Sequence, residues 1–228
     1  MNAIELRGHL EEEMTWRLDE VRFLKNQLGN ISGYEDKKRY RKSLIVMLYS
    51  HFEGFCKASF LMYVQAINNE SIERARLNTR LVAASLSEEF RALRNKDKKS
   101  KIFKNDLPND EKLHEYARQV DLLESLDDFM KKVAQIPEAI VDTESNLKPV
   151  VLRKILYRLG FRHDVFSAHE GAIQMLLHHR NHVAHGARVQ GMDEDQYLEV
   201  EKSVRYLMTE IVELVFYALI NEEFLKSR

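Results

Sequence analysis

The sequence has few of the residues that interrupt helices, because only eight glycines and three prolines occur among its 228 residues. This scarcity argues against a fold of many turns and short strands, and it favours long helices. The one cysteine, Cys56, excludes an internal disulfide. A hydrophobic core must therefore hold the fold together, and a reducing compartment is the natural setting.

No segment combines the length and the apolar character of a membrane span. The two most apolar windows, around residues 44–62 and 206–220, contain Glu53 and the pair Glu210 and Glu213. The N-terminal residues also lack the apolar centre of a signal peptide. Acidic and basic side chains nearly balance, with a formal net charge of −1. We therefore expect a cytoplasmic protein that has no membrane partner.

Apolar residues recur every three or four positions over most of the chain, which is the period of an amphipathic helix. Helices are predicted over residues 4–28, 35–67, 111–133, 149–159, 164–184 and 193–224, with a weaker helical region over 71–95 and an irregular one over 136–148. Asp164 and Asp193 stand where N-caps are expected. Gly54, inside the most apolar helix, suggests close approach of a neighbouring helix. The predicted fold is all-α, with a four-helix-bundle core and accessory helices in one domain over residues 1–228.

A basic segment interrupts this pattern and is predicted to form an exposed loop over residues 96–110. Its candidate contacts to RNA phosphates are Lys96, Lys98, Lys99, Lys101 and Lys104. One interpretation is a solvated loop without a partner. The other is a patch that attracts a polyanion through counterion release, with contacts to the backbone and not to particular bases.

Histidines gather near the C-terminal half, where six of the nine lie between His163 and His185. His178, His182 and His185 are spaced by four and three residues, which places them near one helix face and could hold a transition metal. Against a metal site, the chain has no His-Glu-x-x-His motif and Cys56 is remote. Solvated or catalytic histidines are therefore favoured, and no metal or other cofactor is expected.

Arg180 falls in the middle of an apolar helix face formed by Ile173, Leu176, Leu177, Val183 and Ala184. A guanidinium in such a place is costly unless something anionic meets it. His185 follows five residues later, roughly 140° further round the helix at about 100° per residue. Arg180 and His185 therefore converge within one chain only if the helix loosens near Gly186, and otherwise they meet across two chains.

The pair Arg180 and His185 suits attack on a phosphodiester by a neighbouring 2′-hydroxyl. A neutral imidazole can accept or donate a proton near neutral pH, and a guanidinium can bind two phosphate oxygens at once. The reaction needs a base, an acid and charge stabilisation, but no metal. One histidine per chain supplies one proton-transfer group, whereas a symmetric dimer supplies two.

The spacing alone is not decisive. Arg158 and His163 have the same spacing, but Gly160 ends the predicted helix between them. Arg180 stands instead inside an apolar helical segment, and the polar Asn181 follows it.

The segment Arg180-Asn181-His182-Val183-Ala184-His185-Gly186 resembles the Arg-polar-x3-His signature of the HEPN superfamily, which includes many helical ribonucleases of prokaryotic defence systems. Residues 50–57, and residues 144–147 leading into 151–160, resemble its MAE-like branch, and the similarity spans about residues 31–218. The resemblance implies a four-helix core, a dimer and metal-independent endoribonuclease activity. It also implies that Arg180 and His185 are catalytic and that Asn181 positions the site.

The resulting prediction is an RNA-cleaving toxin or antiviral effector with a composite dimer site. Its expected partners are RNA, a second copy of the chain, and a cognate antitoxin or defence-system protein. His182 is a candidate RNA contact. Glu53 is a candidate for the same cleft, although such a residue more often pairs with a cation on a neighbouring helix. The alternatives are a non-catalytic dimerisation or regulatory module that binds a partner protein or nucleic acid, in which Arg180 holds an interfacial carboxylate, and a histidine-based metal protein.

Overall fold

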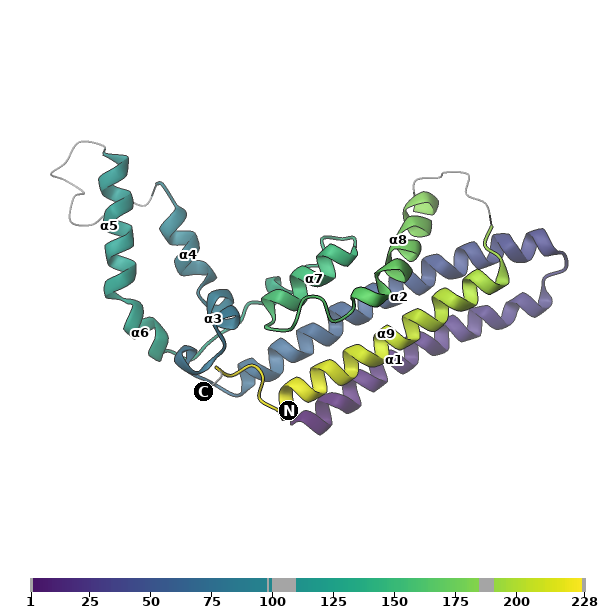
Figure 1. Ribbon diagram of the computed structural model, residues 1–228, viewed down its shortest axis with the longest axis horizontal. Coiled ribbons are helices and arrows are strands. Elements are labelled where there is room, and N and C mark those ends of the chain that lie inside the picture. Colours follow the sequence, from purple (N-terminus) through teal and green to yellow (C-terminus); the bar gives the residue numbers. More distant parts are fainter. Residues whose placement is uncertain (1, 98, 100–109, 185–190, 227–228) are drawn as a thin grey trace.

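The computed structural model describes residues 2–97, 99, 110–184 and 191–226, and these ranges are helical with irregular connections (Figure 1). The α-helices are α1 (Ala3–Asn26), α2 (Tyr34–Asn69), α3 (Thr79–Ser85), α4 (Ser87–Arg94), α5 (Glu111–Glu124), α6 (Leu126–Lys131), α7 (Pro149–Arg158), α8 (Glu170–Ala184) and α9 (Glu194–Ile220). Short 3-10 turns are η1 (Gln27–Asn30), η2 (Arg74–Arg76), η3 (Glu138–Ile140) and η4 (Ser167–His169). The predicted all-α class is confirmed.

Helix α2 is the centre of a four-helix core, because it packs against α1, α8 and α9. Figure 1 shows α1, α2 and α9 running side by side, with α8 leading away from them. The middle of α2 is buried, as the apolar segment predicted. Gly54 faces α1, as predicted, but a Cβ there would lie 3.7 Å from the guanidinium nitrogens Nε and Nη2 of Arg17, an ordinary van der Waals contact, so the approach of α1 does not require glycine. Cys56, in the same turn, is fully buried.

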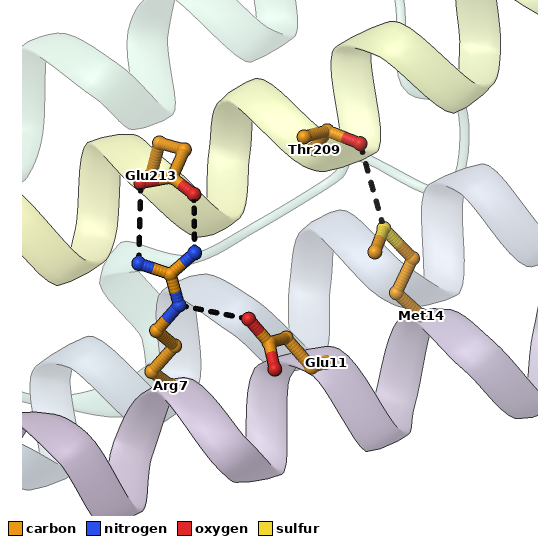
Figure 2. A network of polar contacts seen from close by, with 5 residues as sticks. All are labelled: Arg7, Glu11, Met14, Thr209 and Glu213. Carbon is orange, nitrogen blue, oxygen red and sulfur yellow. Dashed lines mark hydrogen bonds and ion pairs between the residues drawn. The ribbon is translucent and has the colours of Figure 1, made fainter.

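Polar contacts fix the register of α1 against α9 (Figure 2). Arg7 of α1 donates two hydrogen bonds to the Glu213 carboxylate of α9, at 2.6 and 3.4 Å, and a third to Glu11 at 2.8 Å. About two turns further along α1, the Thr209 hydroxyl of α9 lies 3.9 Å from the sulfur of Met14. These side chains are partly exposed, so we expect each pair to specify alignment more than stability.

Helix α7 begins and ends as its sequence predicts. Pro149 occupies the first turn, and Gly160 follows the last turn with a φ of +93°. A Cβ on Gly160 would lie 2.6 Å from Nδ2 of Asn78, whose side-chain oxygen caps α3 by accepting a hydrogen bond from the Leu81 amide at 3.1 Å. Glycine is therefore required at this position both by the backbone conformation and by the close approach of α3.

Neither of the two side chains predicted as N-caps binds an amide of its helix. The helix expected to start after Asp164 starts at Glu170, because the chain first forms η4, and the Asp164 carboxylate binds Arg162 instead of a helix amide. Asp193 does stand at the N-cap position of α9 but caps no amide. Its carboxylate instead accepts a hydrogen bond from the Tyr34 hydroxyl at 2.5 Å and pairs with Lys38 at 3.2 Å.

Three helix boundaries also differ from the predictions. The helix predicted over 111–133 is divided at Ser125 into α5 and α6, and α6 packs on η2, where Arg74 donates a hydrogen bond to the Phe129 carbonyl at 3.1 Å. The weak helical region over 71–95 becomes η2, α3 and α4, and α9 ends at Ile220. No helix within the described ranges is long and apolar enough to cross a membrane.

A buried histidine lies between α1 and α2. The ring of His51 meets the Trp16 ring edge-on, with 5.5 Å between the centroids, and Glu20 Oε2 lies 3.3 Å from its Nε2 without forming a hydrogen bond. Burial lowers the pKa of His51 below its ordinary value, the Glu20 carboxylate opposes this shift, and Arg17 adds to it.

The stability of the protein is therefore expected to fall as the pH falls below about 6.5, the pKa of an unfolded histidine. Between that value and the lower folded pKa of His51, the unfolded chain binds more protons than the native one, so stability rises with pH across the window. Urea unfolding of the wild type and His51→Gln between pH 5 and 8 would measure this, and the variant should show the shallower dependence. The exposed His163, changed to Gln, should behave as the wild type. Parallel curves for all three proteins would contradict the assignment.

Candidate functional site

Arg180 lies in the last turns of α8, where that helix packs on α2. Its side chain is partly buried, and its guanidinium carbon lies 5.4 Å from the centre of the Tyr49 ring of α2. Nη1 donates a hydrogen bond to Oδ1 of Asn181 at 3.0 Å, and Nη2 donates one to the Ser145 carbonyl at 3.4 Å. Three segments distant in the sequence thus meet at one guanidinium.

The partners of Arg180 are all neutral. An aromatic face, an amide oxygen and a backbone carbonyl surround it, and no carboxylate of the described residues forms an ion pair with it. A guanidinium has five N–H donors, so two hydrogen bonds leave capacity for an anion. Arg180 is also less deeply buried than Ile173, Leu176 and Leu177, so the helix-face prediction placed it too far into the core. The site therefore offers a fixed positive charge at the edge of the core.

Tyr49 holds this arrangement to the bundle. It is buried, its hydroxyl oxygen accepts a hydrogen bond from the Leu147 amide at 2.7 Å, and the hydroxyl donates to Oδ1 of Asn146 at 3.4 Å. Burial, followed by the charge of Glu53 one turn along α2, raises the pKa of Tyr49 well above its ordinary value. The phenol is therefore neutral at physiological pH and acts as an anchor for the segment that faces Arg180.

The segment that faces Arg180 is strained. Glu144 and Ser145 have φ values of +53° and +55°, a left-handed conformation that residues other than glycine rarely adopt. Each such residue typically costs about 1–3 kcal/mol, and such strain is concentrated at functional sites. The conformation is held by a hydrogen bond from the Glu144 amide to Asp142 at 2.8 Å and by an ion pair of Glu144 with Lys154 at 2.8 Å. It directs the Ser145 carbonyl toward Arg180.

The histidines of α8 contact one another. His182 and His178 rings lie 4.0 Å apart between centroids, and the His182 Nδ1 lies 2.7 Å from the His178 carbonyl, so Nδ1 is assigned the proton. His179 is partly buried, and burial, together with the neighbouring histidines and Lys42, lowers its pKa. Among the described residues, no group of three potential ligands could hold a metal ion. His185 lies outside the described residues.

The predicted site residues are only partly brought together. Asn181 contacts Arg180, and Glu53 lies beside Tyr49. The role of Glu53 in the cleft and the contact of His182 with RNA stay predictions.

The basic segment is described only in part. Lys96 and Lys99 are exposed near the tip of the α4 and α5 pair, and Lys98, Lys101 and Lys104 lie outside the described residues. Figure 1 shows that this tip stands far from the end of α8. Within one chain, therefore, the described part of the basic segment, with Lys96 and Lys99, does not border Arg180.

Tyr49 was not singled out from the sequence, and Ser145 was named there only within residues 144–147, which resemble the MAE-like branch. Tyr49 and Glu53 are four residues apart on α2, which places them on the same helix face. That spacing was a usable signal for Tyr49. Ser145 contributes its carbonyl through a left-handed backbone that no glycine marks, so the resemblance placed its segment but did not predict its contact with Arg180.

One comparison with known proteins gives a match. The model of the family described as RiboL-PSP-HEPN matches residues 12–216, from α1 to the last turns of α9. No curated protein and no solved structure matches significantly. This match supports the predicted HEPN superfamily. Membership of the MAE-like branch, and the assignment of residues 180–185 as the superfamily signature, stay predictions.

Proposed function

The chain belongs to the RiboL-PSP-HEPN family, and from that premise we propose that it is a metal-independent endoribonuclease of a toxin–antitoxin or antiviral defence system. Membership of a HEPN family suggests an RNase-like or nucleotide-related function. The observation that carries the proposal is the guanidinium of Arg180, partly buried and contacted only by neutral groups among the described residues. An anionic phosphate is the group that such a charge lacks.

The proposed reaction is transfer within the RNA chain. A base removes the proton of a 2′-hydroxyl, and the 2′-oxygen attacks the adjacent phosphorus. The bond to the 5′-oxygen breaks, and an acid protonates that leaving group. The products end in a 2′,3′-cyclic phosphate and a 5′-hydroxyl. Arg180 binds the scissile phosphate and stabilises the charge that develops on it, while Asn181 positions the guanidinium through its amide oxygen.

A composite site in a homodimer supplies both proton-transfer groups. His185 of each chain serves as base or acid, because one histidine cannot hold both roles in the same step. The five-residue spacing between Arg180 and His185 in the sequence supports a meeting across two chains. His182 and the basic segment add contacts to RNA. The proposed role in cytoplasmic defence, with a cognate antitoxin or defence protein as partner, rests on the superfamily.

The experiment that tests the proposal is incubation of the purified full chain with RNA in EDTA. We expect cleavage, fragments with 5′-hydroxyl ends that polynucleotide kinase labels directly, and 3′ ends that become extendable only after removal of the cyclic phosphate. Cleavage that disappears with the chelator would refute the mechanism. A wild type that cleaves no RNA, together with loss of the dimer in Arg180→Ala, would favour the non-catalytic module.

A further inference from the structure

A second feature, apart from Arg180, has the chemistry of a nucleic-acid contact. A groove of about 630 Å³ lies between the α3 and α4 segment and the C-terminal end of α7, and we refer to it as the α3/α7 groove. Its apolar lining includes Ala83, Ala84 and Ile140, and Arg80, Tyr157 and Arg158 add an aromatic ring and two cations. This volume lies within the range typical of small-ligand sites.

The aromatic ring and one cation of the α3/α7 groove contact each other. The guanidinium carbon of Arg80 lies 4.4 Å from the centre of the Tyr157 ring, and Arg80 Nη1 donates a hydrogen bond to the Phe161 carbonyl at 2.8 Å. Tyr157 nevertheless remains 54% exposed, which is far from the burial of a core tyrosine. A ring that contacts a cation and still has open surface is suited to receive a planar base.

The charges of the groove favour an anion. Of its two carboxylates, Glu88 pairs with Arg91 at 3.0 Å, and Asp142 accepts a hydrogen bond from the Glu144 amide at 2.8 Å. Arg80 and Arg158 form no ion pair with any residue in the part of the chain that the structure describes. Two cations that lack carboxylate partners beside an exposed aromatic ring combine phosphate attraction with base stacking.

The α3/α7 groove is connected to the site around Arg180 by α7 and by the loop before that helix. This helix has Tyr157 and Arg158 at its C-terminal end, and the loop before it runs from Asp142 in the groove to Ser145 beside Arg180. Ten helical residues span about 15 Å, at about 1.5 Å per residue. Figure 1 shows α7 between α3 and α8. A single strand that reaches Arg180 can therefore follow α7 into the groove.

We propose that the α3/α7 groove binds a nucleotide of a single-stranded RNA substrate, away from the scissile phosphate. The base stacks on Tyr157, and Arg80 and Arg158 contact the adjacent phosphates. A strand without pairing is required, because bases inside a duplex cannot present their faces. This inference rests on the proposed function and defines its substrate as unpaired RNA that extends at least one α7 length from the cleavage point.

The test measures binding and not cleavage, so that its failure is distinct from failure of the proposed function. Fluorescein-labelled single-stranded RNA of ten nucleotides is titrated by anisotropy with the full chain carrying His185→Ala, in EDTA. Adding Tyr157→Ala should weaken binding roughly 5- to 150-fold, the range for loss of one stacked base. Tyr157→Phe should bind as the parent does, because the ring is kept.

Tyr217→Ala is the matched control, since Tyr217 of α9 is 53% exposed and does not line the groove. Tyr217→Ala should leave binding unchanged. Arg158→Gln should reduce the slope of log affinity against log salt by about one, which corresponds to the loss of one phosphate contact. Equal binding by Tyr157→Ala and its parent would overturn the proposal. The proposal would also be overturned if uridine monophosphate bound at the groove as tightly as the decamer does, because the groove would then be a site for a free nucleotide.

Discussion

Replacing His185 by alanine is expected to lower the rate of RNA cleavage by about 10²- to 10⁴-fold, which is the usual contribution of one general acid or base. In a composite site both copies of the histidine are lost together, so the larger value is expected. Replacing Arg180 by alanine should cost roughly 10²- to 10³-fold, as loss of a donor that stabilises developing charge does. Single-turnover cleavage of labelled RNA, with protein in excess, measures both rates.

His163→Ala is the matched control for this prediction, because His163 follows Arg158 with the same spacing and is exposed. It should cleave as the wild type does. The oligomeric state of all three variants should be measured alongside, since a variant that dissociates would lose activity for another reason. If cleavage survives both Arg180→Ala and His185→Ala while the dimer is intact, the proposed mechanism is wrong.

Replacing Tyr49 by alanine is expected to lower the free energy of unfolding by roughly 3–5 kcal/mol, as for other buried aromatic side chains. The ring of Tyr49 is 1% exposed and lies in the centre of α2, and its loss leaves a cavity among the four core helices. Tyr49→Phe keeps the ring over Arg180 but leaves the Leu147 amide without its acceptor, at a cost of about 1–3 kcal/mol. Urea unfolding measures both changes.

Tyr197→Phe provides the control. Its hydroxyl is also buried, but it has no hydrogen-bond partner in the part of the chain that the structure describes. Removing it should therefore leave stability unchanged or raise it slightly. If Tyr49→Phe were as stable as Tyr197→Phe, the hydrogen bond to Leu147 would not hold the strained segment. Cleavage by Tyr49→Phe should fall as well, because the Ser145 carbonyl would no longer be fixed beside Arg180.

The helices were predictable where one physical signal determined them. The apolar period of α1 and α2, and Pro149 with Gly160 around α7, gave boundaries close to those observed. Predictions were wrong where tertiary contacts competed with local ones. Asp193 carries an N-cap side chain, but Tyr34 and Lys38, 159 and 155 positions earlier in the sequence, bind its carboxylate instead.

The candidate site was predictable only along α8. Arg180 and Asn181 are neighbours in the sequence and contact each other in the fold. Their other surroundings come from α2 and from residues 142–147, whose approach depends on how the bundle closes. The left-handed pair Glu144 and Ser145 is stabilised by Lys154 of α7, not by a glycine, so composition gave no indication of it.

Helix α2 has one consequence for how this protein can change. The same helix contributes Tyr49 to the surroundings of Arg180 and packs against α1, α8 and α9. A substitution that shifts α2 within the bundle therefore displaces the aromatic face beneath the guanidinium. Under the proposed function, adaptation toward a new RNA target is consequently easier in the segments outside the bundle, where a substitution leaves α2 in place.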